Sequence, residues 1–240
     1  MKILAIVPAR GGSKGIKNKN IVLLAKKPLI SWTLNECKKI LDSRKYDIDF
    51  IVSTDSKEIL DVACKEGFYN DQLRPANLSS DAALTLDVLK YELLKKEEII
   101  KNKYDYVLLL QPTCPLRRSK HIEDCIDLMF KNDVDSVVSV KNVAISGDHP
   151  FRMKKIENNM LVNFIEQGFE DMRPRQELPD VFLRNGCVYL TRASLIREGE
   201  TVVGKKCLPY IMDEESSTNI DTHADLFVAE FYLNQLANQV

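Results

Sequence analysis

The first twenty residues, Met1–Asn20, read MKILAIVPARGGSKGIKNKN and carry the strongest structural signal in this chain. The apolar run over residues 3–7 is typical of a buried strand, and it leads directly into a loop rich in glycines and cations. Glycine lets a backbone approach a phosphate closely, and fixed cations offset the charge of a polyphosphate. The loop is expected at the carboxyl end of the first strand, where open α/β sheets bind their ligands. The stretch therefore predicts an α/β protein that binds a nucleoside triphosphate.

This loop differs from the two best-known phosphate-binding loops. Its glycines, Gly11, Gly12 and Gly15, match neither G-x-x-x-x-G-K-[ST] nor G-x-G-x-x-G. The simplest alternative is a tight glycine turn with solvated lysines. We favour phosphate binding because the cations directly follow an apolar strand, which places them at one edge of the sheet. These cations are Arg10, Lys14, Lys17 and Lys19.

Strand and helix patterns alternate along the rest of the chain, which predicts a largely parallel sheet covered by helices in a single domain, residues 1–240. Further strand patterns lie at 50–54, 105–110, 135–140 and 186–191, with a weaker edge strand at 206–212 around a proline. Helical patterns follow Pro28, cover 84–100, begin near Ser119, and close the chain. Asp55 with Glu58 is expected to cap the second helix, and Ser119 the fourth. Residues 141–183 are more polar and lack a helical stripe, so we interpret them as an inserted arm.

Composition argues against several classes of protein. The formal net charge of −1 supplies no overall basic field for nucleic acid. No apolar run has the length of a membrane span, and the N-terminus lacks the layout of a signal peptide. Six scattered cysteines and three histidines without ligand spacing predict neither a disulfide framework nor a zinc site. We therefore expect a cytoplasmic protein with no nucleic-acid or membrane partner.

A series of short motifs along the chain resembles the acylneuraminate cytidylyltransferases, also called CMP-sialic acid synthetases. The motifs are IVPARGGSKG (6–15), NKN (18–20), KPLI (27–30), STD (53–55), RP (74–75), LQPTCPLR (110–117), RQELP (175–179), NG (185–186) and NIDT (219–222). The resemblance covers nearly the whole chain. It implies a Rossmann-like three-layer fold, CTP and an acidic sugar as substrates, and Mg²⁺ as cofactor. It also implies a homodimer in which the arm makes dimer contacts and reaches the partner's acceptor site.

Charge and position suit the first loop to the triphosphate. Lys19 is a candidate to stabilise pyrophosphate as it leaves, because phosphoryl transfer needs charge neutralisation and positioning more than covalent help. The resemblance makes Arg10 and Lys19 catalytic and adds Asn20 and Arg74 as nucleotide contacts. On its own, Arg74 would be interpreted as a solvated loop arginine. The full nucleotide-binding set is Arg10, Gly11, Gly12, Ser13, Lys14, Lys19, Asn20 and Arg74.

Asp221 is the candidate metal ligand. Mg²⁺ favours one or two carboxylates together with substrate phosphates. Locally, Asp221 could also cap the last helix, where Thr222 and Asp225 form a capping pair. The resemblance favours the metal role, with Asp221 also catalytic and Asn219 as a second ligand. The family commonly has aspartate where this chain has Asn219, which brings a carbonyl oxygen but no charge and leaves metal affinity and number open.

The acceptor side carries fewer signals. Gln111 ends a central strand at the same edge as the phosphate loop, where its amide could orient a sugar hydroxyl or carboxylate, or serve only packing. Arg173, Arg175 and Arg184 form a basic set suited to a carboxylate, with solvated surface charge as the alternative. The resemblance implies substrate-binding roles for Gln111, Arg175 and Asn185.

Together these signals predict a cytidylyltransferase that joins CMP from CTP to the anomeric hydroxyl of a sialic-acid-like nonulosonic acid and releases pyrophosphate. A second enzyme hypothesis is a nucleotidyltransferase for another acidic sugar or a sugar phosphate. A third, from another class, is a nucleotide-binding regulator without catalysis, suggested by Asn219. Sialic, legionaminic and pseudaminic acids all remain open as acceptors.

Overall fold

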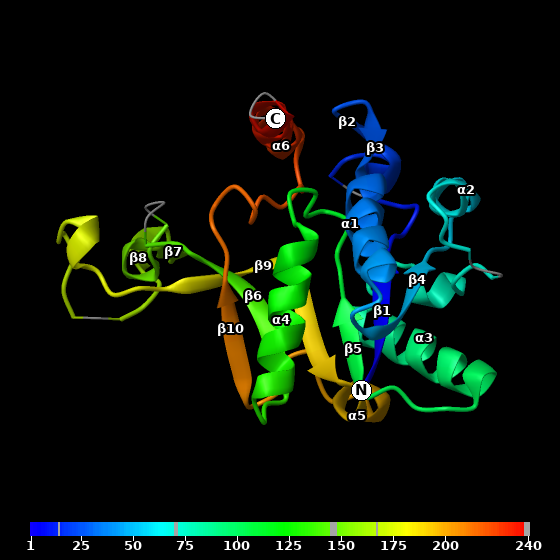
Figure 1. The fold of residues 1–240 in the computed structure, drawn as a ribbon. Coiled ribbons are helices and arrows are strands. Elements are labelled where there is room, and N and C mark those ends of the chain that lie inside the picture. The colour runs from blue at the N-terminus through cyan, green and yellow to red at the C-terminus, as the bar shows by residue number, and fades with distance from the viewer. Residues whose placement is uncertain (14, 70–71, 145–147, 167, 238–240) are drawn as a thin grey trace.

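A mixed six-stranded sheet forms the centre of the protein (Figure 1). The computed structural model describes residues 1–13, 15–69, 72–144, 148–166 and 168–237. The strands lie in the order β10-β6-β9-β5-β1-β4. Their bounds are β1 Lys2–Pro8, β4 Asp47–Ser53, β5 Tyr106–Leu109, β6 Ser136–Asn142, β9 Phe182–Arg192 and β10 Cys207–Ile211.

Helices cover both faces of this sheet, which confirms the expected three-layer α/β fold. The first face carries α1 (Leu29–Ser43), α2 (Lys57–Lys65) and α4 (Ser119–Lys131), and the second carries α3 (Thr85–Ile100) and α5 (Ala193–Glu198). In Figure 1, α1 and α4 lie in front of the strands.

The sequence of β1 explains why two helical layers form. Successive side chains of a strand point to opposite faces of the sheet. Ile3, Ala5 and Val7 join the core beneath the first layer, whereas Leu4 and Ile6 join the core beneath the second. All five side chains are at most 1% exposed. A strand that is apolar on both faces is stable only where both faces are covered.

The direction in which successive strands are added to the sheet reverses at β1. This strand pairs in parallel with β4 on one side and with β5 on the other. The connection to β4 passes through α1 on the first face, and the chain reaches β5 after α3 on the second face. The order of the strands therefore reverses at β1, and such a switch point leaves a crevice at the carboxyl ends of the strands.

The other half of the sheet is less parallel than a uniform βαβ pattern predicts. β9 runs antiparallel to both of its neighbours, β5 and β6. β10 pairs in parallel with β6 at the edge of the sheet and tolerates Pro209 there, as predicted.

The predicted cap of α2 is wrong in detail. The hydroxyl of Ser56, not the carboxylate of Asp55, accepts a hydrogen bond from the Ile59 amide at 3.4 Å. Asp55 is already engaged, because its Oδ1 accepts a hydrogen bond from the Gly11 amide at 2.9 Å. A long-range contact to the first loop has replaced the local one.

The remaining caps give one correction and one confirmation. Ser119 is the first helical residue of α4, and Arg118 occupies the N-cap position. The predicted capping pair before α6 (His223–Ala237) is confirmed. Asp225 Oδ2 accepts a hydrogen bond from the Thr222 amide at 2.7 Å, and Thr222 Oγ1 accepts one from the Asp225 amide at 3.3 Å.

The segment interpreted as an arm stands away from the sheet (Figure 1). β6 and β9 pair outward as far as Asn142 and Phe182, and the arm continues from them. It contains an antiparallel hairpin of β7 (Lys154–Glu157) and β8 (Met160–Asn163). Two short 3-10 turns, η3 (Pro150–Arg152) and η4 (Arg175–Glu177), flank the hairpin.

α6 is apolar on more than one side. Leu226, Ala229 and Leu233 pack into a small core with residues of the first loop and of the short hairpin that follows it, β2 (Leu23–Leu24) and β3 (Lys27–Pro28). Phe227 and Phe231 point outward and are 74% and 58% exposed. Over the residues described, none of the helices combines the length and hydropathy needed to cross a bilayer.

Candidate functional site

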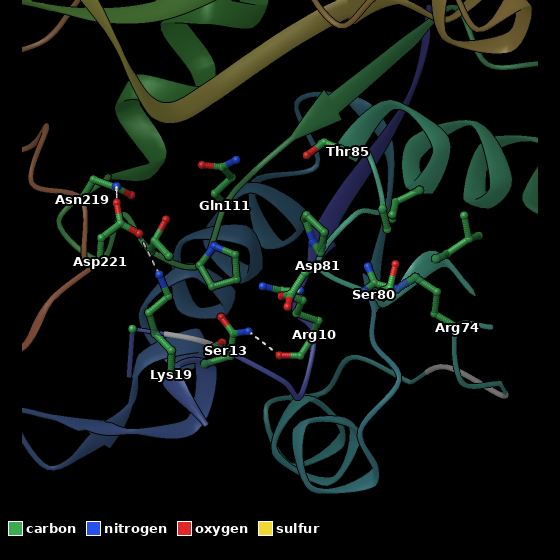
Figure 2. A pocket seen from close by; sticks show the side chains of 18 residues that line it. Arg10, Ser13, Lys19, Arg74, Ser80, Asp81, Thr85, Gln111, Asn219 and Asp221 are labelled. Atoms are coloured by element: carbon green, nitrogen blue, oxygen red, sulfur yellow. Dashed lines mark hydrogen bonds and ion pairs between the residues drawn. The ribbon is translucent and has the colours of Figure 1, made fainter. Parts of the chain in front are cut away.

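A cleft of about 640 Å³ opens where β1 and β5 end. The loop after β1, the turn after β5, the segment before α3 and the loop before α6 all line it (Figure 2). Its lining side chains include three cations and two carboxylates among the described residues, namely Arg10, Lys19, Arg74, Asp81 and Asp221. The cleft therefore lies at the crevice expected from the switch point and has the mixed charge of a phosphate site.

Hydrogen bonds from two other parts of the chain hold the first loop in shape. Asp55 accepts from the Gly11 amide, and the side-chain amide of Asn20 donates to the Arg10 carbonyl at 2.9 Å. A side chain at Gly11 would meet Ser56 Cβ at 3.0 Å, so glycine is needed for this close approach. Asn20, predicted to contact nucleotide, lines the cleft, and its largely buried side chain also positions Arg10 through this bond. Lys14 lies outside the described residues.

Arg10 and Asp81 form an ion pair within the lining of the cleft (Figure 2). Arg10 Nη1 lies 2.6 Å from Asp81 Oδ1, and the two side chains are 32% and 48% exposed. Ser13 lines the same cleft, whereas Gly11 and Gly12 line a separate hollow beside α2.

Arg74 is buried, unlike the solvated loop arginine that its local sequence suggests. Its amide donates to the Thr54 carbonyl at 2.6 Å, and its Nε donates to Ser79 Oγ at 3.0 Å. Burial lowers the pKa of the Arg74 guanidinium from its ordinary value, the charges of Asp55 and Glu92 partly offset this shift, and the charge of Arg10 adds to it. An arginine desolvated beside a second cation is poised to accept an anion.

Lys19 and Asp221 form the opposite wall of the cleft (Figure 2). Lys19 Nζ lies 2.8 Å from Asp221 Oδ1 and also donates to the Ile220 carbonyl at 2.8 Å. The Asn219 side-chain amide donates to Asp221 Oδ2 at 2.7 Å. Both carboxylate oxygens therefore accept hydrogen bonds, although the Asp221 side chain is still 66% exposed.

The donor set at this wall suits a cation that brings most of its own ligands. Within the described ranges, no three or more His, Cys, Asp or Glu side chains cluster to hold a metal ion. The predicted ligand Asn219 turns its amide nitrogen to Asp221, and its oxygen accepts from the Cys114 thiol at 3.7 Å. Asp221 thus supplies the single exposed carboxylate, which fits Mg²⁺ carried in by phosphates and water.

A second cavity of about 460 Å³ adjoins the cleft and shares Gln111 and Asn219 with it. Its polar lining includes two cations, Lys141 and Arg184, two carboxylates, Glu214 and Asp225, and the hydroxyls of Tyr189, Ser217 and Thr218. Val228 and Tyr232 of α6 form one wall. Gln111 therefore lies at the junction of the two spaces, in agreement with its predicted position at the edge of the sheet.

An irregularity in β9 creates the floor of this second cavity. The register between β6 and β9 shifts between Val138 and Val140, and Gly186 within the shifted region has φ +81°. A side chain at Gly186 would come within 2.7 Å of Gln111 Oε1. Bulges of this kind re-aim backbone and side chains next to active sites.

Asn185, predicted to bind substrate, lines the second cavity but uses its side chain to hold this bulge. Its Oδ1 accepts from Ser139 Oγ at 2.6 Å, and its Nδ2 donates to Ser217 Oγ at 2.9 Å. The side chain is buried, so it shapes the cavity through Gly186.

A buried arginine donates hydrogen bonds to backbone carbonyls beside both cavities. Arg117 is 1% exposed. It donates to the carbonyls of Gln111 and Cys187 at 3.1 and 2.7 Å, and to Thr33 Oγ1 at 2.6 Å. A hydrogen bond with the Cys187 thiol lowers the pKa of Cys114, while the same contact and burial raise that of Cys187. The charge of Arg117 acts to lower the pKa of both buried thiols, although Arg117 lines neither cavity.

The three predicted arm arginines separate in space. Arg184 lines the second cavity. Arg173 bonds to Asp171 through two nitrogens at 3.0 and 2.7 Å, which lowers the pKa of that carboxyl to about 2. Arg175 lies in η4 on the arm and lines neither the cleft nor the second cavity.

Sequence reasoning missed the wall between η2 (Ala76–Leu78) and α3. Ser80, Asp81 and Thr85 line the cleft from this segment. A polar run just before a helix was the available signal, because helix N-termini attract anions. The aromatic wall of the second cavity was also missed, since Tyr189 and Tyr232 show no local pattern that separates them from core residues.

The packing of Gly15 against Asp221 gives a direct test of this geometry. A Cβ at Gly15 would lie 2.5 Å from the Asp221 carbonyl oxygen, whereas one at Gly12 would meet nothing within 4 Å. We expect Gly15→Ala to lower the free energy of unfolding by about 1–3 kcal/mol, as overpacking does, and to weaken pyrophosphate binding. Gly12→Ala is the matched control in denaturant unfolding, and equal stability of the two variants would contradict the packing described here.

Comparison with known proteins follows the same lines. A family model described as cytidylyltransferase matches residues 4–179. The CMP-N,N'-diacetyllegionaminic acid synthase of Legionella pneumophila is 33% identical over 99% of each chain. The N-acylneuraminate cytidylyltransferase of Streptococcus agalactiae is 32% identical over 94% of this chain, which spans only 52% of that relative.

A solved structure shares the fold. The CMP:2-keto-3-deoxy-manno-octonic acid synthetase complexed with CTP matches with a TM-score of 0.68, covering 98% of this chain and 100% of that one at 15% identity. At this identity the likeness concerns the fold alone. The family model spans the first strand, the loop after it and both strands that flank the cleft, and the chain belongs to the cytidylyltransferase family.

Proposed function

We propose that this protein transfers CMP from CTP to the anomeric hydroxyl of a nonulosonic acid. The hydroxyl oxygen bonds to the α-phosphorus, the bond from that phosphorus to the bridging oxygen breaks, and pyrophosphate leaves while the hydroxyl proton is released. The observation that carries the proposal is the cleft at the β1–β5 switch point, with Arg10 and Arg74 on one wall and Lys19 with Asp221 on the other. The names of the relatives point to the same chemistry.

In this proposal the cleft holds the nucleotide. Arg10, Lys19 and Arg74 neutralise the triphosphate from different sides, which also restrains it for in-line attack. Lys19 takes the charge that develops on pyrophosphate, because its ammonium lies beside the exposed carboxylate of Asp221 at the mouth of the cleft. Asn20 and Asp55 act indirectly by holding the loop that presents Arg10.

The second cavity is the proposed acceptor site. It adjoins the cleft through Gln111, so a sugar bound there can present its hydroxyl to the α-phosphate. Arg184 and Lys141 supply positive charge for a sugar carboxylate, and Tyr189 and Tyr232 supply walls that pack against a ring.

Mg²⁺ is the proposed cofactor, with Asp221 as its protein ligand. When bound, Mg²⁺ would neutralise the charge of the phosphates. Asn219 orients the Asp221 carboxylate through its amide nitrogen. All six cysteines are free thiols, which suits a reducing compartment, and we propose that the enzyme acts in the cytoplasm.

A homodimer joined through the arm completes the proposal. The arm exposes a large share of its apolar side chains, among them Ile156 (75%), Leu161 (70%) and Met172 (81%). Apolar surface on this scale marks an interaction site in a globular protein. A second copy that covers the arm would also bring Arg175 toward an acceptor cavity, which it does not reach in its own chain.

Pyrophosphate release tests the activity. The assay uses CTP, Mg²⁺ and a panel of sialic, legionaminic and pseudaminic acids, with the other three nucleotides as comparison. We expect Arg10→Ala to lower kcat/KM by about 10²–10³-fold, as loss of one transition-state donor does. Lys17→Ala is the matched control, because Lys17 is an exposed cation of the same loop that lines neither cavity. Silence with every nucleotide and acid would reject the function, and tight CTP binding without turnover would favour the regulator.

Metal dependence tests Asp221. We expect Asp221→Asn to abolish Mg²⁺-dependent turnover and to remove Mn²⁺ binding in the presence of CTP, followed by electron paramagnetic resonance. Asn219→Asp adds a second carboxylate beside the first, so half-maximal activity should need less Mg²⁺. Unchanged Mn²⁺ binding in Asp221→Asn would remove that residue from the metal site.

Mixing two inactive variants tests whether the arm completes the partner's site. Arg10→Ala and Arg175→Ala should each be weakly active alone. In a mixed dimer, one site combines an intact Arg10 with the intact Arg175 of the other copy, so mixing should restore turnover in a fraction of sites. Activity that stays at the sum of the separate variants, although ultracentrifugation shows mixed dimers, would exclude a shared site.

A further inference from the structure

We propose that Asp81 is a counter-charge that weakens the grip of Arg10 on phosphate and thereby speeds the release of pyrophosphate. The inference rests on the proposed function, because it concerns the nucleotide tail in that cleft. It makes Asp81 a positioning residue for the reaction, one that acts through Arg10 and forms no bond to the reacting atoms.

The geometry of the pair is the first support. Asp81 Oδ1 lies 2.6 Å from Arg10 Nη1, and both residues line the cleft (Figure 2). The contact joins the loop after β1 to the segment before α3, and residues of both segments line the cleft. A phosphate oxygen that approaches Arg10 from the cleft therefore meets a carboxylate at the same guanidinium.

The charge balance of the wall is the second support. Arg10 and Arg74 line the same side of the cleft, close enough for the charge of Arg10 to act on Arg74. The charges of Asp55 and Glu92 act on Arg74 from outside the cleft lining, and among the described residues that line this wall Asp81 is the carboxylate that contacts Arg10. A wall without this carboxylate would bind both the substrate triphosphate and the product pyrophosphate more tightly. Tight binding of the product pyrophosphate would slow its release, and product release limits many enzymes.

A carboxylate at contact distance from a phosphate-binding arginine lowers the affinity of the arginine for both anions. It repels both anions and competes for the guanidinium, with an effect of the size measured for partly exposed ion pairs. Asp81 should therefore weaken the binding of CTP and of pyrophosphate together. The opposite hypothesis is that Asp81 only holds Arg10 in place, in which case its loss would weaken both ligands.

Calorimetric titration with CTP and with pyrophosphate distinguishes these hypotheses. We expect Asp81→Asn to bind each ligand about fivefold more tightly than the wild type, with the gain shrinking as salt is added. In turnover, KM for CTP and the inhibition constant of pyrophosphate should both fall, while kcat stays level or falls. Asp81→Glu retains the charge and should restore affinities close to those of the wild type.

Asp87→Asn is the matched control, since it removes the same charge from the exposed first turn of α3 without lining the cleft. It should leave the affinities for both ligands unchanged. Equal or weaker binding by Asp81→Asn, or an equal gain in Asp87→Asn, would overturn the counter-charge. A wild-type protein that binds neither CTP nor pyrophosphate would instead reject the proposed function, and this inference with it.

Discussion

The contact between Lys19 and Asp221 joins the first loop of the chain to the last one, and the cleft depends on it. The Ile220 carbonyl accepts from the same ammonium, and the Ile220 amide donates to the Thr113 carbonyl at 2.8 Å. Three segments that are distant in sequence, after β1, after β5 and before α6, therefore meet within a few ångströms. Gly15 fits this junction because no side chain separates it from the Asp221 backbone.

The sequence predicted those features that depend on a single helix or strand. The apolar run of β1 predicted its burial on both faces, and Thr222 with Asp225 predicted the start of α6. The first loop and Asp221 both proved to line one cleft. The first loop follows β1, at the carboxyl end where open α/β sheets bind their ligands.

The failures share one physical cause, a distant partner that no local pattern reveals. Asp55 has the pattern of a helix cap but accepts a hydrogen bond from Gly11, 44 residues away. Asn185 lines the second cavity, and its bonds to Ser139 and Ser217, 46 and 32 residues away, are likewise visible only in the fold. The direction of β9 also escaped, since a buried strand has the same apolar pattern in either direction. Asp81 was missed because only folding brings it to Arg10.

The shared position of Gln111 and Asn219 between the two cavities has a consequence for how such a protein can diverge. These two residues line both cavities, so a substitution at either one changes the shape of both cavities. Tyr189, Val228 and Tyr232 belong to the second cavity alone, two of them on a terminal helix that carries little of the main core. Substitutions on that helix can therefore reshape the second cavity while the lining of the cleft stays unchanged.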